Sequence, residues 1–69
     1  MEIRAKFGTL VKKRRGELGL SQEDLAGLAD LDRTYISGIE RGVRNPTLTV
    51  LARLSEALDQ KLAEMLKDL

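Results

Sequence analysis

The sequence contains no cysteine, no histidine and no tryptophan, and its 69 residues include one phenylalanine, one tyrosine and one proline. Without cysteine the chain has no disulfide framework and no thiolate metal site, which fits a reducing cytoplasm. Without histidine or cysteine it also lacks the commonest general base and the best thiol nucleophile. Because aromatic residues are so scarce, the core must be aliphatic. We therefore expect a cytoplasmic protein that is not an enzyme and needs no cofactor or metal.

Long hydrophobic runs are also missing. No stretch is apolar over the length needed to span a bilayer, and the N-terminus has no signal-peptide region. A chain of this length forms a single small domain over residues 1–69 and buries about 60% of its unfolded surface. So small a core leaves little stability, and oligomerisation is one way to add to it.

Helical periodicity covers nearly the whole chain. Residues 3–18 carry apolar side chains on one stripe, which predicts a first helix. Thr47 can cap a fourth helix, and Asp59-Gln60 is the only break before a fifth helix over about residues 60–69. The three stripes are formed by Ile3, Phe7, Leu10, Val11 and Leu18, by Leu48, Leu51, Leu54 and Leu58, and by Leu62, Met65, Leu66 and Leu69.

Residues 21–42 predict two further short helices joined by a tight turn. Ser21 and Asp24 have the spacing of a capping box at the start of one helix, and Asp32 can cap the other. Gly42 stands where a helix ends with a left-handed residue. The inner sides of the two helices carry Leu25, Leu28, Ala29, Ile36 and Ile39. Because such short helices are unstable alone, their neighbours must brace them, and we expect an all-α, compact bundle of five helices.

Charge is distributed in blocks, although the net charge is only +1. Residues 1–19 carry six basic and two acidic side chains, residues 20–32 carry four acidic and no basic ones, and residues 33–45 carry three basic and one acidic. A one-faced contact with nucleic acid requires such segregation, but solvated helix faces produce the same blocks. Within the basic run of residues 12–15, Arg14 lies near the apolar stripe, where its stem can pack while its guanidinium stays in water.

Several residues of the 21–42 stretch stand in a known pattern. They are Gln22, Leu25, Ala26, Ile36, Ile39, Glu40 and Gly42. With these residues the stretch resembles the helix-turn-helix of the Cro and phage-repressor type, also called the XRE family. The run DRTYISGIER over residues 32–41 is most similar to the controller proteins of restriction-modification systems. The resemblance implies a lambda-repressor-like DNA-binding bundle with its helix-turn-helix at the second and third helices. Asp30 departs from the pattern, which usually has glycine in the turn, but aspartate tolerates a positive φ better than most residues.

In a helix-turn-helix the second helix enters the major groove of double-stranded DNA, and side chains near its N-terminus reach base edges. The residues at those positions are Arg33, Thr34 and Ser37. Arginine can donate two hydrogen bonds to guanine, and threonine can hydrogen-bond a base or contact the thymine methyl group. The alternative for Arg33 is a surface charge that balances Asp30 and Asp32.

Contacts to the DNA backbone are expected from the start of the preceding helix, from the second helix and from the loop that follows it. The candidates are Gln22, Tyr35, Arg41, Arg44 and Asn45. The resemblance places Gln22 on the DNA backbone, at a helix N-terminus that favours an anion. Tyr35 could instead be a partly buried brace, and Arg44 and Asn45 could be ordinary loop residues. Gly38 has no side chain and would let the helix approach the duplex closely.

The expected function is that of a sequence-specific transcriptional regulator, repressor or activator, acting as a homodimer on a pseudo-palindromic operator. An apolar stripe larger than the end of so small a core needs predicts the dimer interface. That interface would consist of Leu58, Leu62, Met65, Leu66 and Leu69. The competing possibility is that the last helix folds back and completes the core of the monomer. The resemblance further implies a buried ion pair, between Arg15 and Glu40, that joins the first and third helices.

Two other functions remain open. One is an antitoxin-type protein that binds a partner protein and uses its DNA contacts only to regulate its own operon. The other is an interaction module that has lost its DNA contacts, against which the basic residues Arg33, Arg41 and Arg44 argue. Neither a membrane nor a small-molecule ligand is expected as a partner.

Overall fold

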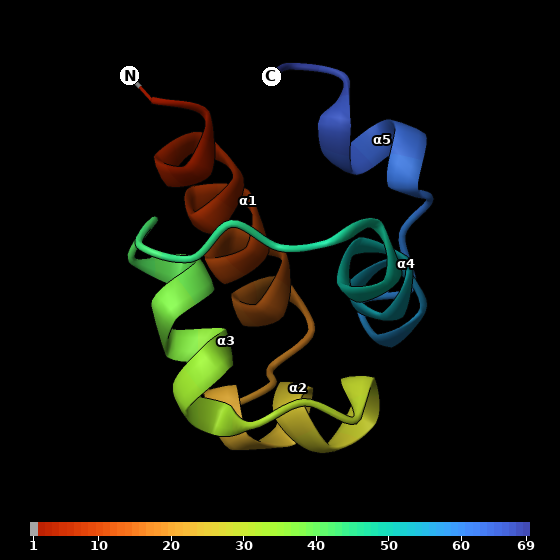
Figure 1. The fold of residues 1–69 in the computed structure, drawn as a ribbon. Helices are drawn as coiled ribbons and strands as arrows, with labels where there is room; N and C mark the ends of the chain where they lie inside the picture. Colours follow the sequence, from red (N-terminus) through yellow and green to blue (C-terminus); the bar gives the residue numbers. More distant parts are fainter. Residues whose placement is uncertain (1) are drawn as a thin grey trace.

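Five α-helices follow one another along residues 2–69, the part of the chain that the computed structural model describes (Figure 1). They are α1 (Ile3–Glu17), α2 (Gln22–Ala29), α3 (Arg33–Glu40), α4 (Leu48–Ala57) and α5 (Leu62–Leu66). No strand occurs in this range, and none of its helices has the length and apolar character needed to cross a membrane. The all-α fold of five helices predicted from the sequence is confirmed.

The helices α2, α3 and α4 begin where a side chain accepts a hydrogen bond from a backbone N–H that has no partner within the helix. The Ser21 hydroxyl accepts from the Asp24 N–H and the Asp24 carboxylate accepts from the Ser21 N–H, both over 2.9 Å, which completes a capping box on α2. Asp32 caps α3 over 2.9 Å, and Thr47 caps α4 over 3.2 Å. The predicted N-caps are therefore confirmed.

Left-handed residues close the turns on either side of α3. Asp30 has φ 55° at the end of α2, and the next residue, Leu31, donates its N–H to the Ala26 carbonyl over 2.9 Å. After α3, Gly42 has φ 77°, and a Cβ added there would lie 2.8 Å from the Cα of Ala5. The turn after α3 thus presses directly on α1, and both the conformation and the space at this position require glycine.

The core is aliphatic apart from one phenylalanine. Its buried members are Phe7, Val11, Leu25, Ala26, Ala29, Ile36, Ile39, Leu54, Leu58 and Met65. Four residues of the predicted apolar stripes are instead exposed, which corrects the sequence-based assignment: Ile3, Leu18, Leu28 and Leu48. Ile3 and Leu48 open α1 and α4, and Leu18 directly follows α1, so no neighbouring helix covers them. Leu28 is 63% exposed although α2 packs against both α3 and α4.

The contacts between the helices show how α3 is held in the bundle. α3 packs against both α1 and α2, α2 also contacts α4, and α5 contacts α1 and α4. In Figure 1, α3 lies alongside α1 and α2 crosses the end of the pair. The close approach of α1 and α3 occurs at Gly8, where an added Cβ would lie 2.7 Å from the carbonyl oxygen of Glu40. The position of α3 is therefore fixed by two helices.

Arg14 connects α1 to the end of α4. Its Nε donates to the Leu58 carbonyl over 2.9 Å and its Nη2 donates to the Asp59 carbonyl over 3.1 Å. The last carbonyls of a helix have no donors within that helix, and a cation is favourable at this end of the dipole. The Arg14 side chain remains 27% exposed, so its guanidinium keeps contact with solvent while it donates to these carbonyls.

Candidate nucleic-acid interface

The packing of α3 on α1 and α2 determines which of its residues face the solvent. Ile36 and Ile39 are 0% and 1% exposed, and Leu25 of α2 is likewise fully buried. α2 and α3 are joined by the three residues 30–32, too few to let the helices separate. Because the inner side of α3 is fully used by the core, its remaining residues are presented to solvent in a fixed direction.

The predicted base-reading residues lie on this outer side. Arg33 and Thr34 are exposed at the first turn of α3, and Ser37 is half-buried one turn later. Among residues 2–69, Arg33 forms no ion pair and no side-chain hydrogen bond, with Asp30 and Asp32 or with any other residue. The alternative role of Arg33 as a balancing surface charge therefore has no support in the structure.

Behind α3, a buried ion pair joins it to α1. The Arg15 Nε donates to one oxygen of the Glu40 carboxylate over 2.7 Å, and its Nη2 donates to the other over 3.0 Å. The side chains are 16% and 3% exposed, respectively. The third nitrogen of the guanidinium donates to the Leu20 carbonyl over 2.8 Å, so Arg15 also holds the loop between α1 and α2.

Gln22 belongs to the same network. Its side-chain amide donates to the Glu40 carboxylate over 3.1 Å and is half-buried at the start of α2. One amide hydrogen of Gln22 is therefore used inside the protein. Its predicted contact with the DNA backbone remains a prediction, and the network fixes the side chain from which such a contact would be made.

The network lowers the pKa of Glu40. Burial of the carboxylate alone would raise its pKa, but hydrogen bonds from Arg15 and Gln22, and the charges of Arg15 and Lys12, more than offset this. The same pairing raises the pKa of Arg15, mainly through its hydrogen bonds to Glu40. Both groups are therefore held in their charged forms at neutral pH.

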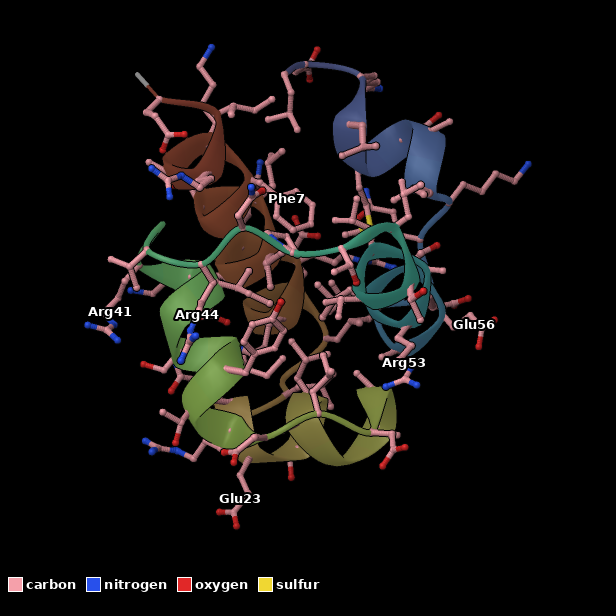
Figure 2. The ribbon with its side chains drawn as sticks, in the orientation of Figure 1. Phe7, Glu23, Arg41, Arg44, Arg53 and Glu56 are labelled. Carbon is pink, nitrogen blue, oxygen red and sulfur yellow. The ribbon has the colours of Figure 1, made fainter. Side chains whose placement is uncertain are left out.

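The loop after α3 carries the other basic residues of this side. Arg41, Arg44 and Asn45 are all exposed, and Figure 2 shows Arg41 and Arg44 on the same side of the molecule, next to α3. The Arg44 guanidinium lies over the ring of Tyr35, 5.5 Å from its centroid. Tyr35 is half-buried and packs against the core, as the alternative role of a brace requires.

The predicted dimer interface needs correction. Leu58 and Met65 are 0% and 3% exposed and belong to the core of the monomer, because α5 folds back onto α1 and α4. Leu62, Leu66 and Leu69 remain half-buried at the surface. Two of them line an apolar groove of about 380 Å³, together with Ile3, Phe7, Pro46, Leu51, Arg4 and Asn45. The sequence stripe did not reveal this groove, because its residues come from both ends of the chain and from the loop before α4.

No group of three or more acidic side chains within the described part of the chain is arranged to hold a metal ion. Asp24, at the start of α2, belongs to the capping box instead, and its pKa is lowered mainly by the hydrogen bond that its carboxylate accepts from the Ser21 N–H.

A braced pair of short helices, with a tight turn between them and an exposed arginine on the second, defines the class of small helix-turn-helix DNA-binding proteins. The chain belongs to the helix-turn-helix family, whose model matches residues 11–65. The control protein C.MunI from a Mycoplasma species is 45% identical over 69 residues, which cover 99% of this chain and 93% of that protein.

Solved structures agree. The controller protein C.AhdI from Aeromonas hydrophila is 45% identical with a TM-score of 0.88, over 90% of this chain and 94% of that one. A second one is the controller protein C.Esp1396I, solved as a tetramer in complex with its natural 35 base-pair operator. It is 40% identical with a TM-score of 0.88, over 99% of this chain and 90% of that one. The predicted resemblance to restriction-modification controller proteins is confirmed.

Proposed function

We propose that this protein is a sequence-specific transcriptional regulator that binds operator DNA as a homodimer, with α3 in the major groove of each half-site. The observation that carries the proposal is the state of Arg33. It is exposed at the start of a helix whose inner side is fixed, and it has no ion-pair partner among residues 2–69. A guanidinium in that position can make the two-pronged contact to guanine that dominates major-groove readout.

The other candidate residues fall into two groups, those that can contact base edges and those that can contact the DNA backbone. Thr34 and Ser37 share the groove-facing side of α3 with Arg33 and contribute to base readout. Gln22 opens α2, and Arg41, Arg44 and Asn45 follow α3; we assign these four residues to contacts with the DNA backbone. Phosphate contacts of this kind fix the register of the protein on the duplex without reading its sequence.

The apolar groove lined by Leu66 and Leu69 supports the homodimer better than the full apolar stripe of residues 58–69 that the sequence suggested. Leu66 and Leu69 offer apolar surface beside Ile3 and Leu51, and a second copy can cover it. Two recognition helices related by a two-fold axis would then lie roughly 34 Å apart, one turn of B-DNA.

The antitoxin alternative receives no support from the relatives. C.MunI and C.BamHI, from Bacillus amyloliquefaciens, are both control proteins and each is 45% identical. A family of DNA-binding regulators is also not a class of enzymes. A regulator must act where the DNA is, and for this reason we assign the protein to the cytoplasm.

The test begins with selection of binding sites from random duplexes by the full chain. We expect enrichment of a pseudo-palindrome with two half-sites about 10 base pairs apart. Arg33→Ala should then weaken binding to the selected operator by about 1–3 kcal/mol and change binding to a scrambled duplex little, as measured by fluorescence anisotropy. Equal losses on both duplexes would reduce Arg33 to a backbone contact, and no enrichment at all would contradict the proposed function.

A further inference from the structure

Gly38 is a glycine that its backbone does not require. It lies inside α3 with helical geometry, unlike Gly19 and Gly42, which have positive φ angles. In a helix interior, glycine costs about 1 kcal/mol relative to alanine. An eight-residue helix that bears the main contact surface is a poor place for that cost. Some contact must therefore require the absence of a side chain.

The contact is with Arg44. A Cβ added to Gly38 would lie 2.6 Å from the Cγ of Arg44, 3.2 Å from its Nε and 3.4 Å from its Cδ. Gly38 is accordingly buried, although it sits on the solvent side of α3. The Arg44 stem thus crosses the helix at the one position where no side chain blocks it, as its place over α3 in Figure 2 also shows.

The ring of Tyr35 supports the other end of the same side chain. The guanidinium carbon lies 5.5 Å from the ring centroid, within the range of a cation–π contact. The ring itself is held by the core. The loop is fastened too, since the Val43 N–H donates to the Gly38 carbonyl over 3.0 Å. The aliphatic part of Arg44, its guanidinium and the backbone of the loop are therefore each held in place by residues of α3.

We propose that Gly38 and Tyr35 form a cradle that holds Arg44 against the DNA-facing side of α3 before DNA binds. Tyr35 is then a positioning residue that acts through its ring, and its hydroxyl is not the group that matters. Arg44 remains exposed and makes no hydrogen bond or ion pair within residues 2–69, so its N–H groups stay available to a phosphate. A side chain already ordered loses less rotamer entropy on binding than one in a free loop. This inference rests on the proposed function.

The free protein provides the first test, without DNA. The only aromatic ring in the sequence besides that of Tyr35 is that of Phe7, which is buried in the core. An upfield ring-current shift of the Arg44 Cγ and Cδ protons in NMR spectra that is lost in Tyr35→Leu therefore reports on the cradle. We expect this shift in the wild-type chain and in Gly27→Ala, where an added Cβ meets nothing within 4 Å. It should be lost in Gly38→Ala and Tyr35→Leu. Random-coil shifts for Arg44 in the wild-type protein would overturn the proposal.

The second test measures binding to selected and scrambled duplexes over a series of salt concentrations. Arg44→Ala should weaken both and lower the salt slope of log K by about one unit. Gly38→Ala should reproduce most of this loss, and the double variant should be no weaker than Arg44→Ala alone, since both changes remove one interaction. Tyr35→Leu should weaken binding about two- to fivefold, and Tyr35→Phe should restore most of that loss.

The outcomes are distinguishable. If Tyr35→Phe loses as much affinity as Tyr35→Leu, the hydroxyl carries the contact and the cradle is refuted. Additive losses in Gly38→Ala and Arg44→Ala would refute it as well. If the ring-current shift is present but the wild-type chain selects no DNA, the proposed function fails while the cradle stands. Tyr35→Leu leaves the helical glycine intact, so it tests the cradle even if Gly38→Ala does not fold.

Discussion

Arg15 and Glu40 are the residues on which the placement of the recognition helix depends most directly. Their bidentate pair lies between α1 and α3, and the same guanidinium and carboxylate engage Leu20 and Gln22. Removing one partner of a buried pair leaves the other as an uncompensated charge, which costs more than the pair itself contributes. The pair therefore acts as a constraint on helix position more than as a source of net stability.

Arg15→Met should lower the free energy of unfolding by about 3–5 kcal/mol, because it leaves the 3%-exposed Glu40 carboxylate without its cation. Lys67→Met is the matched control, since Lys67 pairs with Glu64 at the surface and both side chains are more than half exposed. That change should leave the free energy of unfolding nearly unchanged, because an exposed ion pair contributes little. Urea denaturation of the two variants measures both values, and equal costs would show that burial of the Arg15 pair has no special role.

The lowered pKa of Glu40 predicts loss of stability in acid. A carboxylate whose folded pKa lies below its ordinary value of 4.5 stabilises the fold above about that pH. Its contribution is lost as the pH falls through the folded pKa, because the unfolded chain then binds more protons. The stability difference between the wild type and Glu40→Gln should therefore shrink below pH 4.5. Asp24 shifts in the same direction, so the variant keeps part of the acid dependence. A difference that stays constant down to complete protonation would contradict this.

At the scale of the helices, α1 and α3 approach each other closely at Gly8. Gly8 permits it, because a Cβ there would meet the backbone carbonyls of Ile39 and Glu40, which cannot move as a side chain can. Gly8→Ala should therefore destabilise the protein by about 1–3 kcal/mol. Gly16→Ala, in the same helix but with nothing within 4 Å of the added Cβ, should stabilise it by about 0.5–1 kcal/mol. Thermal unfolding followed by circular dichroism compares them, and shifts of the same sign would refute the close crossing.

Local signals made the helices predictable from the sequence. The capping box of Ser21 and Asp24 depends on four neighbouring residues, and the left-handed Asp30 and Gly42 depend on their own backbone preferences. For the same reason Arg33 could be placed at the start of α3, since helical geometry alone fixes its position relative to the cap.

Contacts between residues distant in the chain were not predictable. Arg14 reaches carbonyls more than forty residues away. Leu58 and Met65 belong to the core of the monomer, where α5 folds back onto α1 and α4, and an apolar stripe alone cannot distinguish this arrangement from an exposed interface. The contact between the Arg44 side chain and Gly38 was likewise not predicted from the sequence. A glycine inside a short helix, kept despite its cost, was the signal that could have indicated a close contact there.

At the scale of the whole molecule, the helices form a small body of 27 × 22 × 22 Å with an apolar groove at its surface, to which residues near both ends of the chain contribute. A single helix in one half-site makes few base contacts, and specificity for a long operator requires two of them held at fixed spacing. Covering the groove with a second copy supplies that spacing and adds buried apolar area to a thin core. The dimer is thus expected to serve both stability and recognition.

The double variant Leu66→Gln, Leu69→Gln should convert the dimer into a monomer while keeping the helical circular dichroism spectrum, because both side chains are only half-buried in one copy. Leu28→Gln is the matched control, since Leu28 is 63% exposed on α2 and lies outside the groove. Sedimentation at micromolar concentrations should give dimers for the wild type and this control. Loss of the second, tethered contact should weaken binding to the selected operator about a hundredfold, and leave binding to a single half-site nearly unchanged. If the wild-type chain sediments as a monomer, or if the double variant still dimerises, the groove is not the interface, and the two half-sites must then be bridged by another surface.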